Sequence, residues 1–261
     1  MTVFVFDIET VPDVEAGRRL YGLEGLPDKE VASVMFHKRR QTTGESEFLP
    51  LHLHRVVAIS AVLAKPGNFK VWSLGEEGAG EAEIIRRFYD GIERFTPVLV
   101  SWNGGGFDLP VLHYRSLVHG IAAPRYWETG DEDNSFRWNN YISRYHARHT
   151  DLMDVLAGYQ PRATARLDEV AVMLGLPGKM GMSGAKVWDS FLAGDVAGIR
   201  NYCETDVLNT YLIYLRFELI RGRLLAPQYE ERCQQVRDYL QQSGKPHLEE
   251  FAAAWRAGNG G

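Results

Sequence analysis

The chain has 261 residues, of which 45% are hydrophobic, so it is long enough to form one large α/β domain with a buried core. Its 29 basic and 34 acidic residues give a net charge of −5, which excludes the overall basic character of a general nucleic-acid binder but not a local basic groove. Two cysteines without CxxC spacing, Cys203 and Cys233, exclude a disulfide scaffold and a thiolate zinc site.

The start of the chain shows no targeting segment. Met1 leads directly into a short apolar run without a basic leader, and that run is too short for a signal peptide or a membrane span. We therefore expect a soluble, cytoplasmic protein that has no association with a membrane.

Four apolar runs predict strands. VFVFDI (residues 3–8) has no polar residue before its end, which is typical of a strand covered on both faces. Residues 54–64 and 69–74, separated by the turn sequence KPGN, predict a hairpin, and PVLVSW (97–102) predicts a fourth strand.

Helical patterns alternate with these strands and then continue alone. Residues 84–95 have the spacing of an amphipathic helix, FDLPVLHYRSLVHG predicts another, and the chain is almost entirely helical after Asp151, with a long helix from about 196 to 223. This order indicates an α/β fold with a mixed central sheet of about five strands and helices on both faces. We expect a main domain at 1–225, followed by a helical extension at 226–261 that ends in a flexible GNGG tail.

Two acids end the first predicted strand. Asp7 and Glu9 are two residues apart, so their side chains leave the same face of the strand with β-carbons about 6–7 Å apart. Asp108 follows the fourth strand and three glycines, at the edge where open α/β sheets bind ligands. Tyr202 and Asp206 are one turn apart on the long helix, beside an apolar stripe that includes Cys203.

If these elements meet, four carboxylates share one site. Like charges so close together cannot all stay ionised unless cations bridge them. Oxygen ligands without an obligatory Cys or His favour Mg²⁺ or Mn²⁺.

The motifs FDIET, NGGGFDLP and YCETD, in this order, resemble the three exonuclease motifs of the DEDD superfamily in its tyrosine-bearing DEDDy branch. The wording is most similar to the proofreading domain of family B DNA polymerases, and the chain resembles stand-alone PolB-like 3′-5′ exonucleases from residue 3 to about 217. This resemblance implies a ribonuclease H-like fold and the removal of mononucleotides from a 3′ end with two Mg²⁺ or Mn²⁺ ions.

The resemblance also implies a role for each motif residue. Asp7 would bridge both metals, Glu9 and Asp206 would hold the ion that activates water, and Asp108 would support the second ion. Tyr202 would orient the attacking water. The residues expected to contact the substrate are Thr10, Asn103 and Phe107, together with two lysines of a glycine-rich segment, Lys179 and Lys186.

The expected substrate is single-stranded or frayed nucleic acid. DNA is preferred because the motifs resemble the DNA-proofreading branch, while protein partners stay open. The alternatives are a 3′ exoribonuclease and a non-catalytic binding module. A dinucleotide-binding oxidoreductase would need a G-x-G-x-x-G turn, which NGGGFD does not supply.

Other segments allow two interpretations each. His52 and His54 favour surface or packing roles over metal binding, and His149 and Asp151 favour buried structural hydrogen bonds over contact with the site. The insert 125–148 interleaves aromatic residues with arginines, as single-strand binding platforms do, but it could equally pack on its own aromatics.

Overall fold

Five strands form one mixed sheet in the order β3-β2-β1-β4-β5 in the computed structural model, which describes residues 2–258. Strand β1 pairs antiparallel with β2 and parallel with β4, while β2 and β3 are antiparallel and β4 and β5 are parallel. The strands are β1 (Val3–Pro12), β2 (His54–Lys65), β3 (Asn68–Ser73), β4 (Val98–Ser101) and β5 (His149–Asp151). The predicted mixed sheet of about five strands is confirmed.

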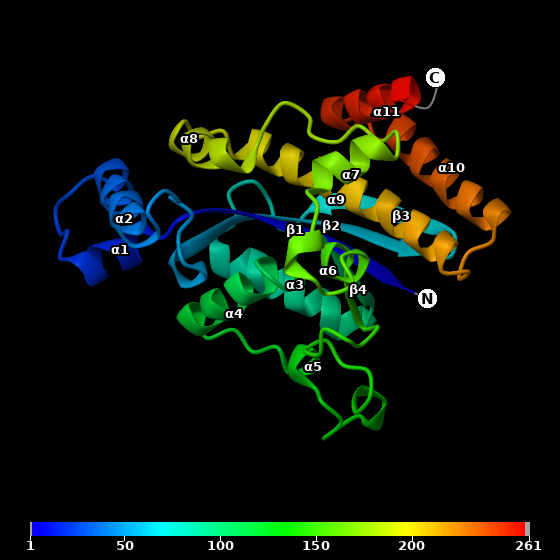
Figure 1. Cartoon of the computed structure of the whole chain (residues 1–261), viewed down its shortest axis with the longest axis horizontal. Coiled ribbons are helices and arrows are strands. Elements are labelled where there is room, and N and C mark those ends of the chain that lie inside the picture. The colour runs from blue at the N-terminus through cyan, green and yellow to red at the C-terminus, as the bar shows by residue number, and fades with distance from the viewer. Residues whose placement is uncertain (1, 259–261) are drawn as a thin grey trace.

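Helices cover both faces of this sheet (Figure 1). They are α1 (Val14–Tyr21), α2 (Asp28–Thr43), α3 (Glu81–Phe95), α4 (Asp108–His119), α5 (Pro124–Trp127), α6 (Leu152–Leu156), α7 (Leu167–Met173), α8 (Val187–Leu192), α9 (Val196–Ile220), α10 (Ala226–Gln242) and α11 (Pro246–Gly258). Short 3-10 turns lie at Leu51–Leu53, Asn134–Phe136, Pro161–Ala163 and Gly184–Lys186.

Alternation along β1 assigns its residues to two cores. Phe4, Phe6 and Ile8 pack with α3 and α4 on one face. Val3 and Val5 pack with α9 on the other. Because side chains alternate along a strand, Asp7 and Glu9 continue the α9 face.

Strand β1 is longer than predicted. It runs to Pro12, but β4 pairs only with Val3–Val5, so one edge of β1 is free of β4 beyond that point. Strand β5 was not located from the sequence, because three residues ending in an acid, HTD, give no apolar run.

The C-terminal helices α10 and α11 pack against α9 and β3, and Figure 1 shows them beside α9, on the side of the sheet opposite α3 and α4. They add large buried side chains to the α9 core: Val236, Leu240, Leu248, Phe251 and Trp255. The predicted GNGG tail falls mainly on residues 259–261, outside the described residues.

Helices α1 and α2 lie at one end of the molecule in Figure 1 and have a small core of their own. That core also contains Leu49 and Leu53, which precede β2. The packing of Leu49 and Leu53 in this core holds α1 and α2 next to the end of β1.

The insert 125–148 packs partly on itself. Tyr126, Phe136 and Tyr141 are buried, and the Arg148 guanidinium lies 3.8 Å from the Phe136 ring centre. Trp138 and Tyr145 remain 81% and 70% exposed. A role of the exposed rings in binding a single strand stays a prediction.

Along residues 2–258, no helix combines the length and apolar character needed to cross a membrane.

Candidate active site

Asp7 and Glu9 lie on the last part of β1, where the α9 face of the strand becomes polar. Glu9 is buried and Asp7 is half-buried. Burial and the charges of neighbouring acids, Asp108 and Asp206 among them, raise the pKa of both carboxyls well above the usual range. Asp7 and Glu9 thus share one electrostatic site with Asp108 and Asp206.

Cys203 of α9 lies close to both Asp7 and Glu9. One ligand atom from each of Asp7, Glu9 and Cys203 lies within 4.8 Å of the other two. The Cys203 thiol is 3.4 Å from the Asp7 carbonyl oxygen and 3.6 Å from Asp7 Oδ2. Burial and the charges of Asp7 and Glu9 raise the pKa of this thiol, which favours the protonated, hydrogen-donating form.

The sequence placed Cys203 only in an apolar stripe. The missed signal was that a helix face packed against β1 must meet Asp7 where the apolar part of the strand ends.

Asp108 comes to the site from the first turn of α4. Its Oδ1 accepts a hydrogen bond from the Ile8 backbone N at 3.1 Å, so Asp108 contacts β1 between Asp7 and Glu9. Burial raises the pKa of Asp108 to about 7, although the Ile8 hydrogen bond opposes the shift.

The turn before Asp108 requires glycine at position 104, whereas the close neighbour of Gly106 is the end of a side chain that can move. A β-carbon at Gly104 would lie 2.3 Å from Ser101 Oγ, and one at Gly106 would lie 2.5 Å from Asn103 Oδ1. Asn103 itself has φ of +64°, a left-handed conformation that asparagine tolerates better than most residues. The tight turn therefore explains Asn103 and Gly104.

Asp151 and His149, at the end of β5, support this turn. Asp151 accepts hydrogen bonds from the backbone N of Asn103 at 2.8 Å and of Gly105 at 2.9 Å. His149 Nε2 lies 2.8 Å from Ser101 Oγ. Both residues make the structural hydrogen bonds that the sequence favoured for them.

Asp206 and Tyr202 come from α9. Burial raises the pKa of Asp206 to about 6, while a hydrogen bond from Tyr202 and the charge of Lys179 oppose the shift. Burial, followed by the charges of Asp206 and Glu9, raises the pKa of the Tyr202 phenol. Tyr202 therefore stays protonated and donates to Asp206.

None of the four carboxylates forms an ion pair with Lys, Arg or His in the part of the chain that the structure describes. Other buried acids of the chain do have such partners, for example Glu81, which pairs with Arg115 at 2.6 Å. Oxygen donors with raised pKa values and no cationic partner are the ligand set that a hard divalent cation stabilises. The residues present therefore fit Mg²⁺ or Mn²⁺.

A groove of about 930 Å³ opens beside Glu9. Four predicted substrate residues line it together with Glu9: Thr10, Asn103, Phe107 and Lys179. Lys186 does not, because it lines a separate hollow next to Tyr202. The sequence did not indicate the rest of the lining, which includes Phe36 of α2 and, before β2, Phe48 and Leu49.

His54 is part of the groove wall. Its Nε2 donates to the Leu49 carbonyl at 3.1 Å, and its Nδ1 lies 2.8 Å from Thr10 Oγ1. With both ring nitrogens engaged, His54 has a packing role, and its ring meets Phe107 edge-on at 5.2 Å. His52 packs on Tyr114 instead, so the two histidines form no metal pair.

Comparison with known proteins finds a family model that matches most of the chain. The model of a family described as a predicted 3′-5′ exonuclease related to the exonuclease domain of PolB matches residues 46–255. The matched span contains Asp108, Tyr202 and Asp206 but begins after β1, so Asp7 and Glu9 join the site through the pairing of β1 with β2 and β4. No curated protein matches the chain.

The match covers well over half of the 261 residues. Together with the mixed five-stranded sheet and its helices, it identifies the fold as the ribonuclease H-like α/β fold that the motifs implied. The chain belongs to the family of predicted 3′-5′ exonucleases related to the exonuclease domain of PolB.

Proposed function

We propose that the protein is a metal-dependent 3′-5′ exonuclease that releases mononucleotides from single-stranded or frayed DNA by a two-metal-ion mechanism. The observation that carries this proposal is the set of four carboxylates from three distant segments, with raised pKa values and no cationic side chain paired to them within residues 2–258. Such a set is costly for the fold unless divalent cations offset its charge.

The acids divide into two groups of metal ligands in this proposal. Asp7, Glu9 and Asp206 would hold one ion, while Asp7 and Asp108 would hold the other. When bound, the two ions would acidify the attacking water and offset the negative charge that develops on the leaving 3′ oxygen.

Tyr202 would orient the attacking water. Burial and the charge of Asp206 raise the pKa of its phenol, so the hydroxyl keeps its proton and is not a base. It can donate one hydrogen bond and accept another, and we assign it the role of fixing the position of the water beside Asp206.

The groove next to Glu9 would receive the 3′-terminal nucleotide. Phe107 offers an aromatic surface for the base, and Thr10 and Asn103 offer hydrogen-bonding groups. Lys179 is exposed at the rim, where its charge can meet a phosphate. The choice of DNA over RNA rests on the likeness of the motifs to the DNA-proofreading branch.

One digestion experiment tests the activity. The protein is incubated with 3′- or 5′-labelled single-stranded DNA and RNA of the same sequence, in Mg²⁺, in Mn²⁺ and in EDTA. We expect mononucleotides from the 3′ end of DNA only when a metal is present. Preferential release from RNA would favour the exoribonuclease, and binding without hydrolysis in every condition would favour the non-catalytic module.

Two variants and a control assign the residues. Asp206→Ala should abolish release, and Tyr202→Phe should slow it on the order of 10²-fold while metal binding is kept. The control is Glu83→Ala, because Glu83 is a half-exposed acid of α3 that forms an ion pair with Arg87 and lies outside the site. Wild-type rates in Asp206→Ala would remove the site assignment, and a fast Tyr202→Phe would remove the water-orienting role.

A further inference from the structure

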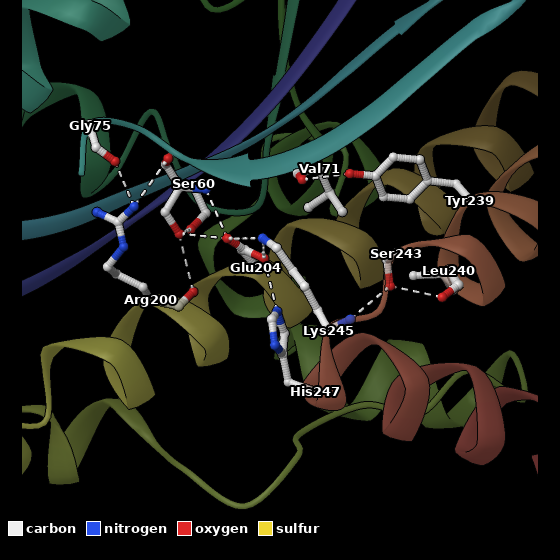
Figure 2. Close-up of polar contacts among 11 residues, drawn as sticks. Ser60, Val71, Gly75, Arg200, Glu204, Tyr239, Leu240, Ser243, Lys245 and His247 are labelled. Carbon is white, nitrogen blue, oxygen red and sulfur yellow. Dashed lines mark hydrogen bonds and ion pairs between the residues drawn. The ribbon is translucent and has the colours of Figure 1, made fainter. Parts of the chain in front are cut away.

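Glu204 is a buried acid in the middle of the third motif that has no part in the proposed metal site. It lies on α9 between Tyr202 and Asp206 and is 3% exposed. Its carboxylate contacts residues at the end of β3 and at the start of α11 (Figure 2).

Four donors from two other parts of the chain converge on this carboxylate. Ser73 at the end of β3 donates from its backbone N at 2.9 Å and from its hydroxyl at 3.0 Å. Lys245 Nζ lies 3.0 Å from Oε2, and His247 Nε2 lies 2.8 Å from the same oxygen. Figure 2 shows both C-terminal side chains reaching Glu204 from the loop between α10 and α11 and from the first turn of α11.

Ser73 belongs to a polar row that crosses the sheet to the proposed metal site. In the strand pairing, Ser73 stands opposite Ser60, and Ser60 stands opposite Asp7. The two serine hydroxyls lie 2.9 Å apart and are both buried. We call Asp7, Ser60 and Ser73 the polar row.

Side chains of helix α9 contact both ends of the polar row. Cys203 contacts Asp7 at one end, and Glu204 contacts Ser73 at the other. One turn earlier, the Arg200 guanidinium donates to the backbone carbonyls of residues 73–76, including that of Gly75 at 2.7 Å. Two consecutive residues of α9 therefore hold the helix to two strands, Cys203 to β1 and Glu204 to β3.

Directional contacts of this kind set a position that apolar packing does not set. Hydrophobic burial is non-directional, so the apolar side chains of α9 limit sliding and rotation of the helix less sharply than its polar contacts do. Hydrogen bonds need particular distances and angles, and a shift of 1 Å breaks them. The distance from Asp7 and Glu9 to Asp206 depends on that shift.

We infer that Glu204 is a positioning residue: it holds α9 in register with the polar row, so that Asp206 and Tyr202 meet the acids of β1. Lys245 and His247 contact Glu204, so the C-terminal helices help to hold it in place. This inference rests on the proposed function for its effect on catalysis. It extends the site to a segment that carries none of the three motifs.

The test compares Glu204→Gln with Glu218→Gln. Glu218 is a matched control because it is buried to a similar extent on the same helix and pairs with Arg221 at 2.7 Å. It is 12 residues beyond Asp206, which is about 18 Å along the helix. Each protein is measured for Mn²⁺ affinity without DNA, for kcat and KM on single-stranded DNA, and for its thermal midpoint.

We expect Glu204→Gln to weaken Mn²⁺ binding and to lower kcat by about 10–100-fold, with little change in KM. Glu218→Gln should lower the thermal midpoint comparably but leave Mn²⁺ affinity and kcat at wild-type values. Wild-type Mn²⁺ affinity and kcat in folded Glu204→Gln, or equal losses in both variants, would overturn the inference.

A milder variant covers the case in which Glu204→Gln fails to fold. Ser73→Ala keeps the backbone N that donates to Glu204 but removes the hydroxyl that links Glu204 to Ser60. We expect several-fold weaker Mn²⁺ binding, and an unchanged affinity would overturn the inference. If the wild-type protein hydrolyses neither DNA nor RNA, the proposed function fails, but the comparison of Mn²⁺ affinities still decides the positioning role.

Discussion

Asp7 shows how one residue links the stability of the fold to its chemistry. Its neighbours on β1 are fully buried, and its carboxylate has three other acids close enough to raise its pKa. A carboxyl whose pKa is higher in the folded state than in the unfolded state binds more protons when folded. Stability from this residue is therefore lost as pH rises through the folded pKa.

Asp7→Asn should reverse that loss. In EDTA at pH 8 we expect the variant to be more stable than the wild type by about 1 kcal/mol or more, because the like charge is removed from a buried cluster. The difference should shrink as pH falls below the unfolded-state pKa of about 3.9, where the carboxyl becomes protonated in both states. Urea unfolding at several pH values measures it.

Divalent metal provides the control for this prediction. Mg²⁺ or Mn²⁺ should stabilise the wild type, because a ligand that binds only the folded state adds to its stability, and should stabilise Asp7→Asn much less. A variant that is no more stable than the wild type in EDTA at pH 8 would contradict the role of charge repulsion at Asp7.

At the scale of elements, the turn between β4 and α4 depends on a strand that the sequence did not reveal. Strand β5 has only three residues, and its Asp151 fixes the backbone of Asn103 and Gly105. A strand this short gives no periodicity, and its pairing with β4 depends on the packing of the whole sheet.

Asp151→Ala tests this support. The variant loses the hydrogen bonds that Asp151 accepts from the backbone N of Asn103, Gly105 and Asp154, which should destabilise the protein by about 2–3 kcal/mol. It should also raise KM, because the loosened turn carries Asn103 and Phe107. Asp154→Ala is the control, since Asp154 pairs with Arg144 at the surface. The variants are compared by urea unfolding and by steady-state kinetics, and equal effects in both would contradict a special role for Asp151.

The sequence predicted those parts of the fold and site in which one segment suffices. The four long apolar runs gave four strands, and the motifs gave Asp7, Asp108 and Asp206. It did not give Cys203, Glu204 or the groove wall at Phe48, because their contacts join segments that are far apart in the chain. Spacing within a segment carries no information about such contacts.

For the whole molecule, the C-terminal helices α10 and α11 complete the core on the α9 face of the sheet. Each large apolar side chain that they bury contributes about 1.5–3 kcal/mol, so Leu240, Leu248 and Phe251 together approach the total stability of an ordinary domain. The division of the chain at residue 225 stays a prediction, and it can be tested directly.

A chain that ends at residue 225 should fail to fold cooperatively. We expect it to aggregate or to lose its sharp thermal transition, because the outer side of α9 and part of β3 would be exposed. Thermal unfolding followed by circular dichroism, with the full chain as reference, measures this. A cooperative transition in the shortened chain would show that residues 1–225 fold as an independent domain.

Strand β1 extends beyond its neighbour β4, which pairs only with Val3–Val5. Beyond Val5, the backbone groups of β1 that point toward the β4 side have no partner in β4. One of these groups, the N–H of Ile8, donates to Asp108 instead. Five consecutive residues, Ile8 to Pro12, line the groove, more than one face of a strand could supply. The terminal nucleotide would therefore meet main chain as well as side chains. This main-chain surface is independent of residue type, so substitutions in the groove should weaken nucleotide binding without abolishing it.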